Sequence, residues 1–281
     1  MIRILHTADW HLDLSNLEFT VPAIEAGIEA AGEYDLFVHA GDLAVNRSNI
    51  HPHVAYEVRR LIELGTEKAR YGGVVIAGNH DQSFQEERKG MVEGILASEG
   101  HINLELFSRP EITSFPSDDQ IRERVGLVMV PTPNKYWWKA RLENNEDPAA
   151  MLQTMIQGLI AEAKDKPGVN RVGVVFHGTV GGAMLSDEMQ MPSGVDVQLP
   201  PQTFASADFV LAGHIHHHQR MDRGVGTCPP VFYPGAPAPL TWNDKLMKPA
   251  LFVHDVSVSG PNTTDSIPLV YSSRDYMVCG A

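Results

Sequence analysis

Short apolar runs rich in β-branched residues recur along the chain, and amphipathic segments separate many of them. Each run is only a few residues long and almost continuously apolar, which is typical of strands buried on both faces of a sheet. We predict such strands at 2–5, 36–39, 74–77, 125–130, 172–176 and 209–211, and late strands at 251–253 and 267–270. Strands that alternate with helices indicate α/β layers around a sheet.

The amphipathic segments predict helices. The clearest lies within 152–163, where the apolar residues share one helical face: Leu152, Met155, Ile156, Leu159, Ile160 and Ala163. A second apolar stripe runs through Val54, Val58, Leu61 and Ile62, and we expect that helix to end at Gly65. Two regions, 108–124 and 131–148, are polar and rich in Pro and Asn, so we expect loops there.

Polar residues follow directly after several of the predicted strands, mostly beside glycine. They are Asp9-Trp10-His11, Gly41-Asp42, Gly78-Asn79-His80-Asp81, His177-Gly178 and Gly213-His214-Ile215-His216. Ligands of layered α/β proteins bind at the carboxyl ends of strands, and glycine lets the backbone turn sharply there. The sequence therefore predicts one functional site assembled from these strand ends.

The side chains at these strand ends mix carboxylate oxygen, amide oxygen and imidazole nitrogen. This set suits Mn, Fe or Zn better than Mg or Ca. The candidate ligands are Asp9, His11, Asp42, Asn79, His177, His214 and His216. They are too many for one ion but fit two divalent ions that share a carboxylate, an arrangement that serves phosphoryl transfer. His80 follows a candidate ligand directly and is not needed to complete either set.

Each motif alone also has an ordinary explanation. Asp42 is typical of a turn, a single histidine such as His177 is often only packed, and His217 and His218 fit a solvated stretch. His6 and His39 fit either support for a ligand or a simple buried, hydrogen-bonded histidine. The whole series in one order favours a metal site.

The order D-x-H, GD, GNHD, H, GHxH resembles the calcineurin-like metallophosphoesterases. The flanks narrow the resemblance, because Ile4–Leu12, Asp208–His216 and Tyr233–Pro237 are similar to motifs of the SbcD branch, whose nuclease subunits process DNA double-strand breaks. The resemblance covers residues 1–254 and implies a four-layer α/β/β/α phosphoesterase sandwich. Residues 255–281 would be a short extension, the remnant of a reduced or absent C-terminal capping domain.

The resemblance also implies roles for the individual residues. Asp9, His11 and His216 would hold one metal ion, Asn79, His177 and His214 the other, and Asp42 would bridge them. The ions would be manganese, with iron or zinc as alternatives, and a hydroxide between them would attack phosphorus. His80 would face the scissile phosphate, stabilise its charge or protonate the leaving oxygen.

The residues that would contact DNA are less well defined. A segment at 133–141 interleaves aromatic and cationic residues that are able to stack on bases and meet phosphates, among them Lys135, Trp137, Trp138 and Lys139. An equally good explanation places the tryptophans in the core. Arg47, in the loop after Asp42, is a further candidate for a phosphate contact.

The formal net charge of −13 argues against a nucleic-acid binder, although bound divalent cations invert the local field. It favours an alternative, a phosphodiesterase or phosphomonoesterase for small molecules. Another alternative is a non-catalytic scaffold subunit, but no ligand position is substituted. The loop 43–46 lacks the acidic residue that protein phosphatases place there, which argues mildly against that activity.

Partners and location follow from the same features. An SbcC-type ATPase is a doubtful partner, because only a short segment follows Pro249, and the stripe at 54–62 would serve either a homodimer or the core. The cysteines, Cys228 and Cys279, have no paired spacing and are expected to be free thiols. Without a long apolar run or a signal peptide, we predict a cytoplasmic protein with no membrane partner.

Overall fold

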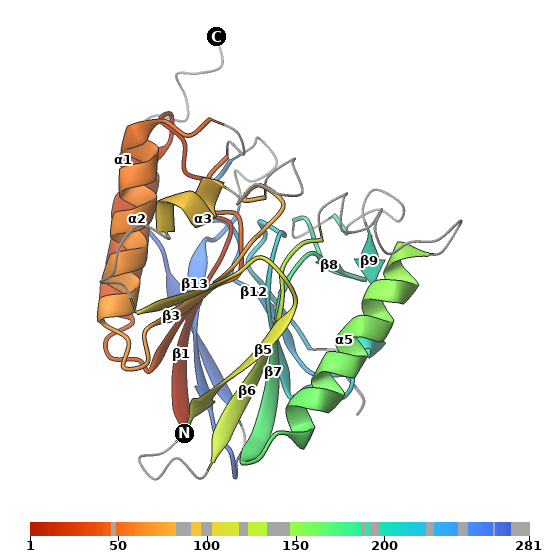
Figure 1. Cartoon of the computed structure of the whole chain (residues 1–281). Helices are drawn as coiled ribbons and strands as arrows, with labels where there is room; N and C mark the ends of the chain where they lie inside the picture. Colours follow the sequence, from red (N-terminus) through yellow and green to blue (C-terminus); the bar gives the residue numbers. More distant parts are fainter. Residues whose placement is uncertain are drawn as a thin grey trace.

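Two sheets lie face to face between helices in the computed structural model of the chain (Figure 1). The structure describes residues 1–45, 49–82, 91–96, 103–117, 123–133, 147–186, 189–190, 197–222, 228–240, 247–260 and 262–270. The helices are α1 (Leu17–Ala30), α2 (Pro52–Glu67), α3 (Met91–Leu96), α5 (Pro148–Asp165) and the 3-10 helix η1 (Pro201–Phe204). Proline occupies the first turn of α2 and α5, where its missing N–H costs no helical hydrogen bond.

The first sheet has the strand order β14-β13-β1-β2-β3-β4. Its strands are β1 (Ile2–Thr7), β2 (Leu36–His39), β3 (Gly73–Ile76), β4 (Leu104–Phe107), β13 (Ala250–Val256) and β14 (Thr263–Pro268). Strands β1 to β4 are parallel, so their carboxyl ends meet at one edge of the sheet. Strand β13 runs antiparallel to β1, and β14 runs antiparallel to β13.

The second sheet has the order β11-β12-β10-β7-β6-β5. Its strands are β5 (Glu111–Pro116), β6 (Arg124–Val130), β7 (Val169–His177), β10 (Phe209–Gly213), β11 (Gln219–Met221) and β12 (Val231–Tyr233). The central strands β6, β7, β10 and β12 are parallel, and a separate pair joins β8 (Thr179–Val180) to β9 (Gln198–Leu199).

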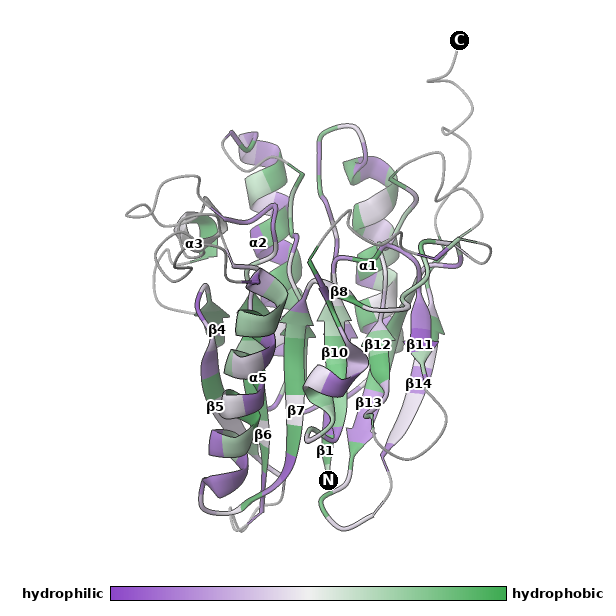
Figure 2. Cartoon of the chain, turned by 90° about the vertical axis from the view of Figure 1, so that its right-hand side faces the viewer, coloured by the Kyte–Doolittle hydropathy of each residue, from purple (hydrophilic) through white to green (hydrophobic). Residues whose placement is uncertain are grey.

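Three apolar clusters hold the layers together. One packs α1 and α2 against the first sheet, through residues such as Ile24, Leu61 and Phe37. A second lies between the two sheets, and a third packs α5 against the second sheet. Figure 2 shows the apolar colouring of the central strands of both sheets. The predicted α/β layers, ordered α/β/β/α, are confirmed.

Several local predictions are wrong. Residues 108–124 are not all loop, because β5 lies within them and pairs with β6 as a partly exposed edge strand. Its pairing comes from backbone hydrogen bonds, which polar residues supply as well as apolar ones. The last strand is 263–268 rather than 267–270. Helix α2 continues past Gly65 to Glu67, and the absence of a side chain at Gly65 makes room for Phe37.

The apolar stripe of α2 is core. Val54, Val58, Leu61 and Ile62 are buried against the first sheet within a single chain. The structure thus favours the core alternative for this stripe, and a homodimer would need another surface. The division at residue 254 stays a prediction, and the hairpin of β13 and β14 runs across it. In the part of the chain that the structure describes, no helix has the length and apolar character needed to cross a bilayer.

A pair of buried histidines lies between the sheets. Nδ1 of His6 is 3.4 Å from Nε2 of His254, and Nδ1 of His254 is 2.9 Å from the hydroxyl of Thr264. Burial lowers the pKa of His6 well below its ordinary value and lowers that of His254 to about 3. The unfolded chain binds these protons below about pH 6.5, so stability is complete above that pH and falls as the pH drops towards the folded values.

We therefore expect His254→Gln to flatten the loss of unfolding free energy on acidification. One buried histidine contributes a slope of up to about 1.4 kcal/mol per pH unit between the two pKa values. Urea unfolding at pH 7, 6 and 5 measures that slope, with the exposed His53→Gln as the matched control. Parallel pH profiles for wild type and His254→Gln would contradict the expectation.

Candidate metal centre

The candidate ligands gather where the parallel strands of both sheets end. Asp9 and His11 follow β1, Asp42 follows β2, and Asn79 follows β3. His177 closes β7, while His214 and His216 follow β10. The convergence follows from the topology, because β1, β2 and β3 are adjacent in one sheet and β7 and β10 are adjacent in the other.

Backbone strain is concentrated at the same place. Among the described non-glycine residues, the left-handed region holds Asp9, His11, Asp42 and His214, with φ of 53°, 43°, 62° and 96°. Such conformations cost on the order of 1–3 kcal/mol each and persist where the surroundings impose them. Here the amides of Asp9 and His11 donate to the carbonyls of Gly41 and Asp42, at 2.9 and 3.1 Å. Every one of the strained residues is a candidate ligand.

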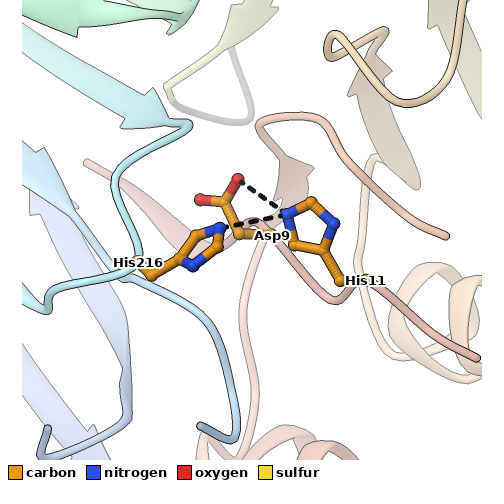
Figure 3. A group of neighbouring side chains, drawn as sticks. All are labelled: Asp9, His11 and His216. Carbon is orange, nitrogen blue, oxygen red and sulfur yellow. Dashed lines mark hydrogen bonds and ion pairs between the residues drawn. The ribbon is translucent and has the colours of Figure 1, made fainter. Parts of the chain in front are cut away.

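The first group joins Asp9, His11 and His216 (Figure 3). Nε2 of His11 lies 3.2 Å from Nε2 of His216 and 4.0 Å from Oδ1 of Asp9. The Asp9 carboxylate also accepts the amide of His214 at 2.9 Å, which ties β1 to the loop after β10. One donor atom from each of the three residues falls within 4.8 Å of the others, a spacing compatible with one ion.

The second group joins Asp42, His177 and His214, with Asn79 beside them. Nε2 of His177 is 3.4 Å from Oδ2 of Asp42 and 3.1 Å from Oδ1 of Asn79. Nδ1 of His214 is 3.0 Å from the same Asn79 oxygen. Nδ1 of His177 donates to the carbonyl of Ala40 at 2.6 Å, which leaves Nε2 facing the ligand group.

Asp42 lies between the two groups. Its Oδ2 is 3.4 Å from Nε2 of His11 and equally far from Nε2 of His177, and its side chain is buried. His80 lies beside it, where the ring packs edge-on against His11 with centroids 4.8 Å apart. Nδ1 of His80 donates to the carbonyl of Val45 at 2.7 Å, so Nε2 is the end of the ring left for a substrate.

Burial governs the protonation of the centre. It lowers the pKa of His11 to about 3 and raises that of Asp9. Burial disfavours both charges of the Asp42–His177 pair, yet their contact raises the pKa of His177 to about 9 and holds that of Asp42 below its usual range. The proton on His177 faces the position a cation would take, so proton and metal ion compete there.

Two residues outside the predicted ligand set shape the loops. Nδ1 of His39 accepts the amide of Gly41 at 3.1 Å, so this buried histidine supports the turn that carries Asp42. Asp81 accepts the amides of Asp42, Leu43 and Gly78. Burial, and then the Asp42 charge, raise the pKa of Asp81 to about 7 despite these three bonds. The sequence offered one signal for Asp81, its place in GNHD, but no reason to assign it a role.

The candidates for DNA contact are not part of this geometry. Arg47, Lys135, Trp137, Trp138 and Lys139 lie outside the described residues. Their predicted contacts therefore stay predictions.

The donor set fits a pair of divalent ions. It combines two carboxylates, an amide oxygen and four imidazoles, and within the described residues no Lys or Arg side chain pairs with Asp9 or Asp42. Buried carboxylates without a cationic partner are costly, and metal coordination is one of the ways proteins offset that cost. The clustered His and Asp side chains suggest a dinuclear divalent metal site.

Comparison with known proteins agrees with this geometry. The family model of calcineurin-like phosphoesterases matches residues 2–218, and the chain belongs to that family. It is also similar to the D subunit of nuclease SbcCD from Escherichia coli strain K12, with 27% identity over 272 residues. The match covers 86% of this chain and 62% of the relative, so the chain spans less than two thirds of that protein's length.

The fold is shared with solved structures of the family. Purple acid phosphatase PPD1 from yellow lupin seeds aligns over 90% of this chain and 49% of its own, with 13% identity and a TM-score of 0.51. The family and the clustered ligands support phosphoester hydrolysis by this chain.

Proposed function

We propose that the protein is a metal-dependent DNA nuclease that hydrolyses phosphodiester bonds. The observation that carries the proposal is the convergence of the D-x-H, GD, GNHD, H and GHxH side chains on one centre, in a chain similar to the D subunit of nuclease SbcCD over 86% of its length. Manganese is the proposed metal, with iron or zinc as alternatives, because the centre is rich in imidazole.

The proposed roles follow the two groups. Asp9, His11 and His216 hold one ion, and Asn79, His177 and His214 hold the other, with Asp42 between them. When bound, the ions supply Lewis acidity for the phosphoryl oxygens and lower the pKa of water. His177 and Asp9 contribute by presenting fixed donor atoms, because His177 is held by Ala40 and Asp9 by the amide of His214.

His80 is proposed to act on the substrate itself. Its Nδ1 is fixed on the Val45 carbonyl, and its ring lies against His11, so Nε2 is held at the edge of the centre. A proton at Nε2 stabilises the phosphoryl charge or passes to the leaving oxygen. A backbone carbonyl thus fixes the ring orientation that a carboxylate would otherwise supply.

The remaining assignments are part of the same proposal. Residues 1–254 form the phosphoesterase domain and 255–281 a short extension, and an SbcC-type ATPase is the proposed partner. The related nuclease is one component of a two-component complex by its name, SbcCD. Arg47 and the 133–141 segment are proposed to contact DNA.

Cleavage of linear duplex, hairpin and single-stranded DNA in the presence of manganese tests the proposal, beside a chromogenic phosphodiester. We expect DNA cleavage that requires manganese and is lost in His80→Ala. The net charge of −13 favours a second candidate, a small-molecule phosphoesterase. Hydrolysis of the chromogenic ester with every DNA intact would support that candidate and overturn the nuclease.

A further inference from the structure

The carboxylate of Asp81 is the hub of the loops that carry Asp42 and Asn79. Its Oδ2 accepts the amide of Asp42 at 2.7 Å and that of Gly78 at 2.8 Å, and its Oδ1 accepts the amide of Leu43 at 3.0 Å. One side chain thus holds the backbone of both loops. The loops follow β2 and β3, which are neighbouring parallel strands.

The connection between the loops is reciprocal. The amide of His80, from the loop after β3, donates to Oδ1 of Asp42 at 2.7 Å. The amide of Asp42, from the loop after β2, donates to Asp81. Each loop therefore contributes a carboxylate that accepts an amide from the other. The orientation of the Asp42 carboxylate depends on both bonds, since one holds its backbone and the other holds one of its oxygens.

Asp81 is buried, with 2% of its surface exposed. Among the described residues no Lys, Arg or His forms an ion pair with it, and its partners are backbone amides. A buried carboxylate with no opposite charge is expensive unless something positive lies near. Asp42, the residue it holds, is placed between the two ligand groups, where divalent cations would bring that positive charge.

From these contacts we propose that Asp81 is a positioning residue of the metal centre. It fixes the Asp42 backbone so that the carboxylate lies between the two groups, and it places a negative charge behind Asp42 that favours divalent ions. The inference rests on the dinuclear centre proposed above. It assigns Asp81 no direct contact with metal or substrate.

Asp81→Asn tests the inference, because it keeps the shape but replaces one acceptor oxygen with a donor. In the metal-free protein, we expect the amides of Asp42, Leu43 and Gly78 to exchange hydrogen at least ~10-fold faster than in wild type. Manganese titration should show affinity lowered by about 10- to 100-fold, the range found for residues that support ligands. Asp35→Asn is the matched control, since Asp35 accepts the amide of Arg3 at the opposite end of β2.

Each result decides the question. Wild-type exchange together with wild-type manganese affinity in Asp81→Asn overturns the inference. If that variant does not fold, Asp81→Glu and the exchange of the same amides in the metal-free wild type decide it, and rapid exchange of these amides in wild type overturns it. A wild-type protein that takes up fewer than two ions contradicts the dinuclear proposal instead, while the exchange of the metal-free proteins still reports on Asp81.

Discussion

Replacement of Asp42 by asparagine is expected to abolish the joint binding of two divalent ions and to lower phosphodiester hydrolysis by at least ~10³-fold. The carboxylate lies 3.4 Å from both His11 and His177, so it is the link between the ligand groups. Asparagine keeps the shape but offers one neutral oxygen, which bridges two cations poorly. A loss of that size corresponds to about 4 kcal/mol of transition-state stabilisation.

Metal content after reconstitution with manganese, together with the spectrum of exchange-coupled Mn²⁺ pairs, measures the first effect. Turnover of a chromogenic phosphodiester measures the second. Asp35→Asn, at the other end of β2, controls for the loss of a carboxylate elsewhere on that strand. Two ions bound with wild-type affinity in Asp42→Asn would remove Asp42 from its proposed bridging role.

The sequence predicts the layered fold because its central strands are buried on both faces. Strands such as β2 and β3 are uniformly apolar and uniformly buried, so composition and environment agree. Strand β5 escapes prediction because its side chains are mostly half-buried or exposed at the edge of a sheet, where backbone pairing with β6 decides the structure. Gly65 misleads for a different reason, since its smallness serves the contact with Phe37 and not the end of a helix.

The residues of the candidate centre were predictable because each follows a strand directly. Their strained backbone was not, since nothing in the side chains of Asp9 or Asp42 requires a positive φ. The supporting contacts of Asp81 were also hidden, because its partners are backbone amides and carry no sequence signal. The carbonyl of Val45 at Nδ1 of His80 is another contact that sequence does not encode as a residue type.

Replacement of His80 by glutamine is expected to lower turnover by about 10²- to 10⁴-fold while leaving two ions bound. The ring touches His11 and the Val45 carbonyl, and no candidate ligand is removed. If Nε2 of His80 protonates the leaving oxygen, the loss depends on the leaving group. It should be large for DNA, whose leaving alkoxide needs a proton, and smaller for a nitrophenyl ester, whose phenolate leaves without one.

Turnover of both substrates, with manganese content measured on the same samples, tests this expectation. His53→Gln, a histidine with 60% of its side chain exposed on α2, serves as the control. Equal losses on the two substrates would limit His80 to stabilising charge on the phosphoryl group. Loss of bound manganese in His80→Gln would instead make the residue part of the metal-binding set, and the division between ligands and substrate contact would have to be redrawn.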